Sequence, residues 1–112
     1  MNAKQEFMRH VENRKITYAF ILKDEGYRYD SKKRPQPHEL KEGFTSDDYL
    51  SFVESLDFTY DEGFGSQELF GYILFKDGAW MERHEYDGSE VWEYKSSPKI
   101  EFISKAVYEQ VL

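Results

Sequence analysis

Several charged side chains in the last third of the sequence have the types and spacing of metal ligands. Glu82 and His84 are two residues apart, and Asp87 and Glu90 follow closely. If residues 79–86 form a strand, Glu82 and His84 point to the same side of it. Carboxylate oxygens and an imidazole nitrogen can together hold a divalent cation. The pattern permits a metal site, but a His beside a Glu on a solvated strand is also ordinary in a chain that is 33% charged.

A second pattern has the order Asp…Glu-x-Lys, which restriction-type nucleases use. Asp77 is followed by Glu93-Tyr94-Lys95. In such sites two carboxylates hold a metal ion and the lysine polarises phosphate or water. Glu-x-Lys also occurs at residues 39–41, where a loop is expected, and acidic surroundings disfavour DNA. A metal-dependent hydrolase or nuclease that uses Glu82, His84, Asp87 and Glu93 is therefore the alternative function.

Other catalytic patterns are absent from the sequence. It has no cysteine, which excludes a disulfide scaffold and any cysteine-based metal site, and it has no Gly-x-Ser-x-Gly motif. Gly63-Phe64-Gly65 is not followed by Gly-Lys-Ser/Thr and comes after Asp61-Glu62, which would repel phosphate. No cofactor is expected, and the leading interpretation is not an enzyme.

The charge is distributed unevenly along the 112 residues. Residues 1–41 hold 10 Lys/Arg and 6 Asp/Glu, whereas residues 42–112 hold 5 Lys/Arg and 16 Asp/Glu. The net charge of −7 therefore conceals a strongly acidic C-terminal two-thirds. Such a surface repels nucleic acid and attracts basic proteins, so we expect a basic protein partner and no direct binding to nucleic acid.

Carboxylates recur every two or three residues through the region that also holds both tryptophans. The residues expected to bind the partner are Asp57, Asp61, Glu62, Trp80, Glu82, Glu85, Asp87, Glu90, Trp92 and Glu93. Spread over twisted hairpins, these carboxylates could present negative charge much as a nucleic-acid backbone does. The other interpretation is that the charge run is only a solvated face.

Hydrophobic periodicity predicts the elements that position these residues. Ala3, Phe7, Met8 and Val11 predict a first helix, and residues 16–22 predict a strand that is apolar on both faces and hence central. Pro35 and Pro37 predict a loop over residues 31–43, after a short strand at 27–30. Thr45 is the expected N-cap of a helix that ends near Leu56 and buries Tyr49, Leu50, Phe52 or Val53, and Leu56.

The second half predicts a meander of three strands. Residues 68–76, 79–86 and 90–95 are separated by Asp77-Gly78 and Asp87-Gly88, which are strong hairpin signals. In the first of these strands, Leu69, Ile73 and Phe75 share one face and Phe70, Tyr72 and Leu74 the other. One face should meet helices, and the other should leave aromatic side chains partly exposed.

A last helix is expected over residues 104–112. The predicted order is α-β-β-α-β-β-β-α, a single α+β domain over residues 1–112 with an antiparallel sheet of four to five strands and helices packed against it.

Residues 64–71, 75–80 and 85–94 carry a resemblance to known proteins. Their amino-acid sequence resembles that of small acidic proteins of unassigned function from tailed phages and prophages, for example at Phe64-Gly65-Ser66-Gln67-Glu68 and Glu85-Tyr86-Asp87-Gly88. The resemblance covers about a third of the chain, all of it within residues 64–94. It implies a mobile-element setting, in which small acidic proteins often inhibit host defence enzymes.

These observations lead to one functional expectation. The protein should be a non-enzymatic inhibitor that binds a basic, nucleic-acid-handling host enzyme, as anti-CRISPR, anti-restriction and immunity proteins do. We expect it in the cytoplasm, because the N-terminus lacks an apolar secretory segment and no apolar run is long enough to span a membrane. A virion or structural protein that forms oligomers, such as a homodimer, is a further possibility.

Overall fold

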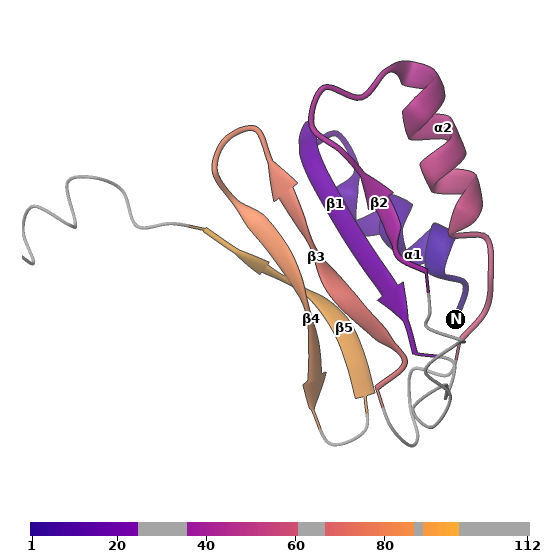
Figure 1. The fold of residues 1–112 in the computed structure, drawn as a ribbon. Coiled ribbons are helices and arrows are strands. Elements are labelled where there is room, and N and C mark those ends of the chain that lie inside the picture. Colours follow the sequence, from indigo (N-terminus) through magenta and orange to yellow (C-terminus); the bar gives the residue numbers. More distant parts are fainter. Residues whose placement is uncertain (25–35, 61–66, 87–88, 97–112) are drawn as a thin grey trace, which may run out of the picture.

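The computed structural model describes residues 1–24, 36–60, 67–86 and 89–96, and within them it has the predicted α+β architecture (Figure 1). The elements in chain order are α1 (Ala3–Val11), β1 (Ile16–Lys23), β2 (His38–Leu40), α2 (Ser46–Ser55), β3 (Leu69–Phe75), β4 (Trp80–Tyr86) and β5 (Ser89–Lys95). The strand predicted at residues 27–30, the glycine-rich turn at 61–66 and the helix at 104–112 lie outside the described residues.

The strands form one antiparallel sheet with the order β2-β1-β3-β4-β5. β3, β4 and β5 are the predicted meander, and β1 lies between β2 and β3, which confirms its expected interior position. Within the described chain, β2 and β5 are the edges of the sheet. Figure 1 shows α1 behind β1 and α2 beside β2.

The helices and one face of the sheet enclose the core. Apolar residues of α1 and α2 share a buried cluster with alternate residues of β1, β3, β4 and β5. The rings of Phe7 and Phe52 meet edge to face with centroids 5.5 Å apart. Thr45 is the N-cap of α2, as predicted, and forms a capping box in which its side chain and that of Asp48 each accept the other residue's backbone N–H.

The prediction that residues 31–43 form a loop is wrong at its C-terminal end, where His38–Leu40 form β2. β2 pairs with β1 through Ala19 and Leu40, Phe20 and Glu39, and Ile21 and His38. Pro37 precedes the first paired residue of an edge strand, a position where the missing N–H of proline removes no ladder hydrogen bond.

The helical faces also differ from the prediction at individual positions. Met8 is 45% exposed and Leu50 is 60% exposed, although both were expected in the core. Glu6 lies outside the apolar pattern of Ala3, Phe7, Met8 and Val11, yet its side chain is buried. The periodicity of α1 cannot show this, because the partner of Glu6 is Arg83, which lies on β4.

An irregularity in the pairing of β1 with β3 changes which side chains of β1 face the core. The register shifts between Ile16 and Tyr18. Ile16, which strict alternation groups with Tyr18 and Phe20, is therefore buried in the core beside Ala19 and Ile21.

Gly71 allows β1 and β3 to approach closely. It has φ +148, and a Cβ atom built on it would lie 2.1 Å from the carbonyl oxygen of Phe20. No other residue type fits here without movement of β1, because the atom in the way belongs to the backbone.

Candidate functional site

The sheet face opposite α1 is rich in aromatic and aliphatic side chains. We call it the aromatic face, and its residues are Tyr18, Phe20, Leu22, Phe70, Tyr72, Leu74 and Trp80. They come from β1, β3 and β4, where strand alternation points them away from the core. Within the described residues, the helices pack against the opposite face, so this face stays open to solvent.

Tyr72 is the centre of the aromatic face. Its ring stacks on Tyr18 with centroids 5.6 Å apart and on Phe20 with centroids 6.0 Å apart. Tyr72 is still 39% exposed, and its neighbours Phe70 and Leu74 are exposed to a similar degree. Ring stacking holds these side chains in place before any partner arrives, which reduces the entropy lost on binding.

The aromatic face is hollowed beside Tyr72. A depression of about 510 Å³ is lined mainly by Phe20, Tyr72, Leu74, Trp80 and Glu82. Gly71 also lines it, at the point where β3 approaches the backbone of β1 closely. A depression of this kind accepts an inserted side chain, as the pockets at the centre of protein interfaces do.

Carboxylates lie at both sides of this apolar surface. On β2, Glu39 accepts a hydrogen bond from the hydroxyl of Tyr18. On β4, Glu82 accepts one from Trp80 Nε1 at 2.8 Å, and Lys95 Nζ lies 3.3 Å from its other oxygen. On β5, Glu93 lies 3.5 Å from His84 Nδ1. We call Glu39, Glu82 and Glu93 the acidic rim.

These contacts shift the pKa values of Tyr18 and Glu82. The hydrogen bond to Glu39, together with desolvation, raises the pKa of Tyr18 well above its usual value, so its hydroxyl stays protonated. The hydrogen bond from Trp80, together with Lys95, lowers the pKa of Glu82. The rim carboxylate on β4 therefore stays charged under mildly acidic conditions.

A buried charge cluster lies on the core side of the same strands. The guanidinium of Arg83 is 3.0 Å from Glu6 Oε1 on α1 and 2.6 Å from Glu90 Oε1 on β5. Arg83 also donates to the Tyr60 hydroxyl at 3.1 Å and stacks on the Trp92 ring, 4.9 Å from its centroid. All three charged side chains are at most 2% exposed, so their attraction is little screened by water.

The two carboxylates of this cluster have further partners. Glu90 accepts the backbone N–H groups of Glu68 and Leu69, at 2.7 and 3.0 Å, where β3 begins. Glu6 accepts the Tyr60 hydroxyl at 2.5 Å. Burial would lower the pKa of Arg83, but Glu6 and Glu90 outweigh it and the pKa is raised. Burial and Glu6 raise the pKa of Tyr60. The cluster joins α1, β3, β4, β5 and the segment after α2.

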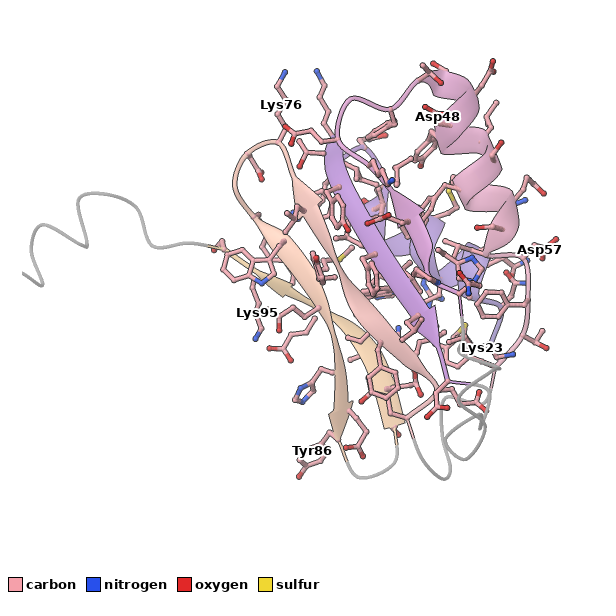
Figure 2. All side chains as sticks on the ribbon, viewed as in Figure 1. Lys23, Asp48, Asp57, Lys76, Tyr86 and Lys95 are labelled. Atoms are coloured by element: carbon pink, nitrogen blue, oxygen red, sulfur yellow. The ribbon has the colours of Figure 1, made fainter. Side chains whose placement is uncertain are left out.

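The structure divides the ten residues predicted to bind a partner. Trp80, Glu82 and Glu93 lie together on the aromatic face and its rim. Glu85 is exposed near the end of β4, and Asp57 is exposed beside Asn2, on the α2 side of the molecule away from Lys95 (Figure 2).

The remaining predicted residues are not part of this surface. Glu90 and Trp92 are buried in the core, so the expectation that they belong to an exposed surface is wrong. Both point inward because they alternate with the outward Glu93, and Glu90 is held by Arg83. Asp61, Glu62 and Asp87 lie outside the described residues.

The residues of the alternative metal site are only partly brought together. Glu82, His84 and Glu93 share the outer side of β4 and β5, while Asp87 lies outside the described residues. In the part of the chain that the structure describes, no group of three or more His, Asp or Glu side chains is arranged to hold a metal ion. The contacts of Glu82 and Glu93 are instead with Trp80, Lys95 and His84.

Sequence reasoning missed the contribution of β1 to this site. The meander was expected to supply the exposed aromatic side chains, but Tyr18, Phe20 and Leu22 extend the surface by a whole strand. The available signal was the apolar character of both faces of residues 16–22 together with the aromatic side of β3, which implies an uncovered pair of neighbouring strands.

None of the described helices is long and apolar enough to cross a membrane. No protein-family model matches the sequence, and neither the curated proteins nor the solved structures contain a significant match to it.

Proposed function

We propose that this chain is a binding protein without catalytic activity, which engages a basic protein through the aromatic face and its acidic rim. The observation that carries the proposal is that a stacked set of aromatic side chains remains exposed on the sheet while carboxylates border it on β2, β4 and β5. The few residues that dominate the binding energy at protein interfaces are enriched in Trp, Tyr and Arg, and charges at the rim select the partner and speed association.

Charge complementarity supports a basic partner over a second copy of the same chain. Each copy carries a net charge of −7, so face-to-face pairing would bring like-charged rims together. A partner that exposes Arg and Lys around an apolar side chain would satisfy the rim and fill the depression beside Tyr72. Nucleic-acid-handling enzymes have such surfaces, since they neutralise phosphates with Arg and Lys.

The resemblance of residues 64–94 to small phage proteins supports a more specific form of the proposal. The protein would act in the cytoplasm of an infected cell as an inhibitor of a host nucleic-acid-handling enzyme, of the anti-CRISPR, anti-restriction or immunity type. It would occupy the groove that normally receives nucleic acid, because acidic residues beside aromatic ones can replace phosphates beside bases.

Affinity capture with matched variants tests the proposal. The whole chain is immobilised and exposed to bacterial lysate beside the variant Y72S/L74S, and captured proteins are quantified by mass spectrometry. The control is M8S/L50S, which removes two apolar side chains of similar or greater exposure from the helices. We expect basic nucleic-acid-binding proteins that Y72S/L74S loses and M8S/L50S retains. Capture that both variants retain equally would refute the aromatic face as the binding surface.

Two further measurements test the character of the partner. With the captured protein purified, association should slow steeply between about 0.05 and about 0.5 M NaCl, and less steeply for E82Q/E93Q. A rate that does not change with salt would refute the role of the rim. If sedimentation instead shows a dimer that only Y72S/L74S disrupts, the face binds a second copy and the proposal is wrong.

A further inference from the structure

A second concave site lies at the end of the sheet where α2 begins, away from the depression of the aromatic face. The turn before β1, the turn between β3 and β4 and the first residues of α2 meet around a depression of about 580 Å³. Small-molecule pockets typically have volumes of about 300–1,000 Å³. Figure 2 shows Lys76 and Asp48, which belong to two of these segments, at the same end of the molecule. We call this depression the basic pocket.

The basic pocket concentrates positive charge on an acidic protein. Arg14, Lys15 and Lys76 line it, and no Asp or Glu of the described residues does so. The backbone N–H of Lys76 donates to the carbonyl of Lys15 at 2.8 Å, which holds the two lysine-bearing segments together. Among the described residues, none of these three cations has a carboxylate within 4.0 Å.

Arg14 is held in place by rings instead of by an acid. Its guanidinium lies 4.0 Å from the centroid of Tyr94 and 5.3 Å from that of Phe75. Stacking on rings orients a guanidinium without neutralising it, so its charge remains available to a ligand. Three like charges gathered at one end repel one another, and a bound anion would relieve that repulsion.

The other wall of the basic pocket is apolar. The rings of Phe44 and Tyr49 stack with centroids 6.1 Å apart, and Leu50 is 60% exposed beside them. Desolvation raises the pKa of Tyr49, in keeping with an apolar setting. A planar apolar group of a ligand can pack against this surface, which combines an exposed leucine with a stacked aromatic pair.

Two carboxylates that are adjacent in sequence to lining residues accept backbone hydrogen bonds. Asp48 accepts the backbone N–H of Thr45 within the capping box of α2, and Asp77 accepts that of Ala79 in the turn after β3. Neither lines the basic pocket. The site thus combines a cationic side with an apolar side across a cavity of small-molecule size.

We infer that the basic pocket binds a phosphorylated nucleoside, with its phosphates at Arg14, Lys15 and Lys76 and its base against Tyr49 and Leu50. Phosphate oxygens match a guanidinium and two ammonium groups, and a base is a planar group of the kind that covers aromatic and aliphatic side chains. Inorganic phosphate alone would leave the apolar wall exposed. This inference is independent of the proposed protein partner, because the two sites share no residue.

An NMR titration of the whole ¹⁵N-labelled chain tests the inference, with ATP, adenosine and inorganic phosphate as separate probes. ATP should shift the amide signals of residues 14–16, 44–50 and 76 in a saturable manner at about 1 mM, where a ligand of millimolar Kd is half bound. Adenosine and inorganic phosphate should each bind about tenfold more weakly, since each uses one wall only.

Two variants with the same change in charge complete the test. K15Q/K76Q removes two cations of the basic pocket, and R9Q/K41Q removes two cations that do not line it. ATP affinity should fall about tenfold or more in K15Q/K76Q and less than about twofold in R9Q/K41Q. Equal losses in both variants, equal binding of inorganic phosphate and ATP, or no saturable shift with ATP would each overturn the assignment.

Discussion

The guanidinium of Arg83 lies 2.6 Å from the carboxylate of Glu90 on the neighbouring strand, and both side chains are about 1% exposed. The residues are not directly opposite, since Arg83 pairs with Trp92 and Glu90 with Glu85. The ion pair is therefore diagonal across the β4–β5 hairpin, and Arg83 lies over the Trp92 ring on its way to Glu90. Glu6 approaches the same guanidinium from α1.

Replacing Arg83 by methionine should be strongly destabilising. The change removes the only cation near Glu6 and Glu90 in the described core and leaves two buried carboxylates facing each other. Breaking a buried ion pair from one side costs about 3–5 kcal/mol. The free energy of unfolding, measured by urea denaturation at neutral pH, should fall by this amount.

The control for R83M is K95M, which removes an ion pair from the outer side of the same hairpin. Lys95 and Glu82 are each more than 40% exposed, and exposed pairs contribute little to stability. K95M should leave the urea midpoint nearly unchanged. Equal effects of the two substitutions would show that the buried cluster is not a principal source of stability.

Tyr60 should make the protein lose stability at alkaline pH. Burial and the hydrogen bond to Glu6 raise its pKa in the folded state above the ordinary value of about 10. The unfolded chain then releases the phenolic proton before the folded chain does, so this contribution is complete below about pH 10 and declines as the pH rises further. Urea midpoints measured between pH 8 and pH 11 should show the decline.

Y60F should make that alkaline decline less steep, leaving the part due to Tyr18, whose pKa is also raised. It should cost about 1 kcal/mol at neutral pH, because Glu6 loses a hydrogen-bond donor. Y86F, at a tyrosine that is 77% exposed, is the control and should keep the decline of the wild type. If Y60F declines as steeply as the wild type, then Tyr60 is not the group that titrates.

Gly71 and Gly78 should respond very differently to alanine. Both have positive φ, at +148 and +91, but a Cβ atom at Gly71 meets the Phe20 carbonyl oxygen at 2.1 Å whereas Gly78 has open space. G78A should cost about 1 kcal/mol from backbone strain alone. G71A must also separate β1 from β3, so its urea midpoint should fall much further, and amide shifts should change along residues 18–22. Similar effects of the two variants would show that β1 can move aside.

The parts of the fold that could be predicted are those whose sequence signals come from residues close together in the chain. Asp77-Gly78 forms the turn between the two strands that flank it in sequence. Thr45 and Asp48, three residues apart, form the capping box at which α2 begins. These features were predicted because every residue involved is near in sequence. β2 was missed because a three-residue strand after Pro37 is stabilised by pairing with β1, about twenty residues away.

The candidate sites were predicted less well for the same reason. The outward position of Trp80, Glu82 and Glu93 follows from strand alternation, but Glu90 has the same residue type as Glu93 and is buried. Strand alternation places Glu90 on the side opposite Glu93, and Arg83 together with the amides of Glu68 and Leu69 supplies the partners that let it be buried there. A carboxylate in a charge-rich strand therefore cannot be assigned to the surface from its residue type alone.

Glu82 provides a direct measure of the electrostatics of the acidic rim. The hydrogen bond from Trp80 Nε1, followed by the contact with Lys95, lowers its pKa. NMR titration of the Glu82 side-chain carboxyl should therefore give a pKa below the usual value for glutamate, of about 4.3. W80F and K95M should each raise this pKa, because the indole hydrogen bond and the contact with Lys95 both lower it. A greater effect of K95M would show that charge, and not the hydrogen bond, keeps this part of the rim ionised. An unshifted pKa in the wild type would mean that neither contact persists in solution.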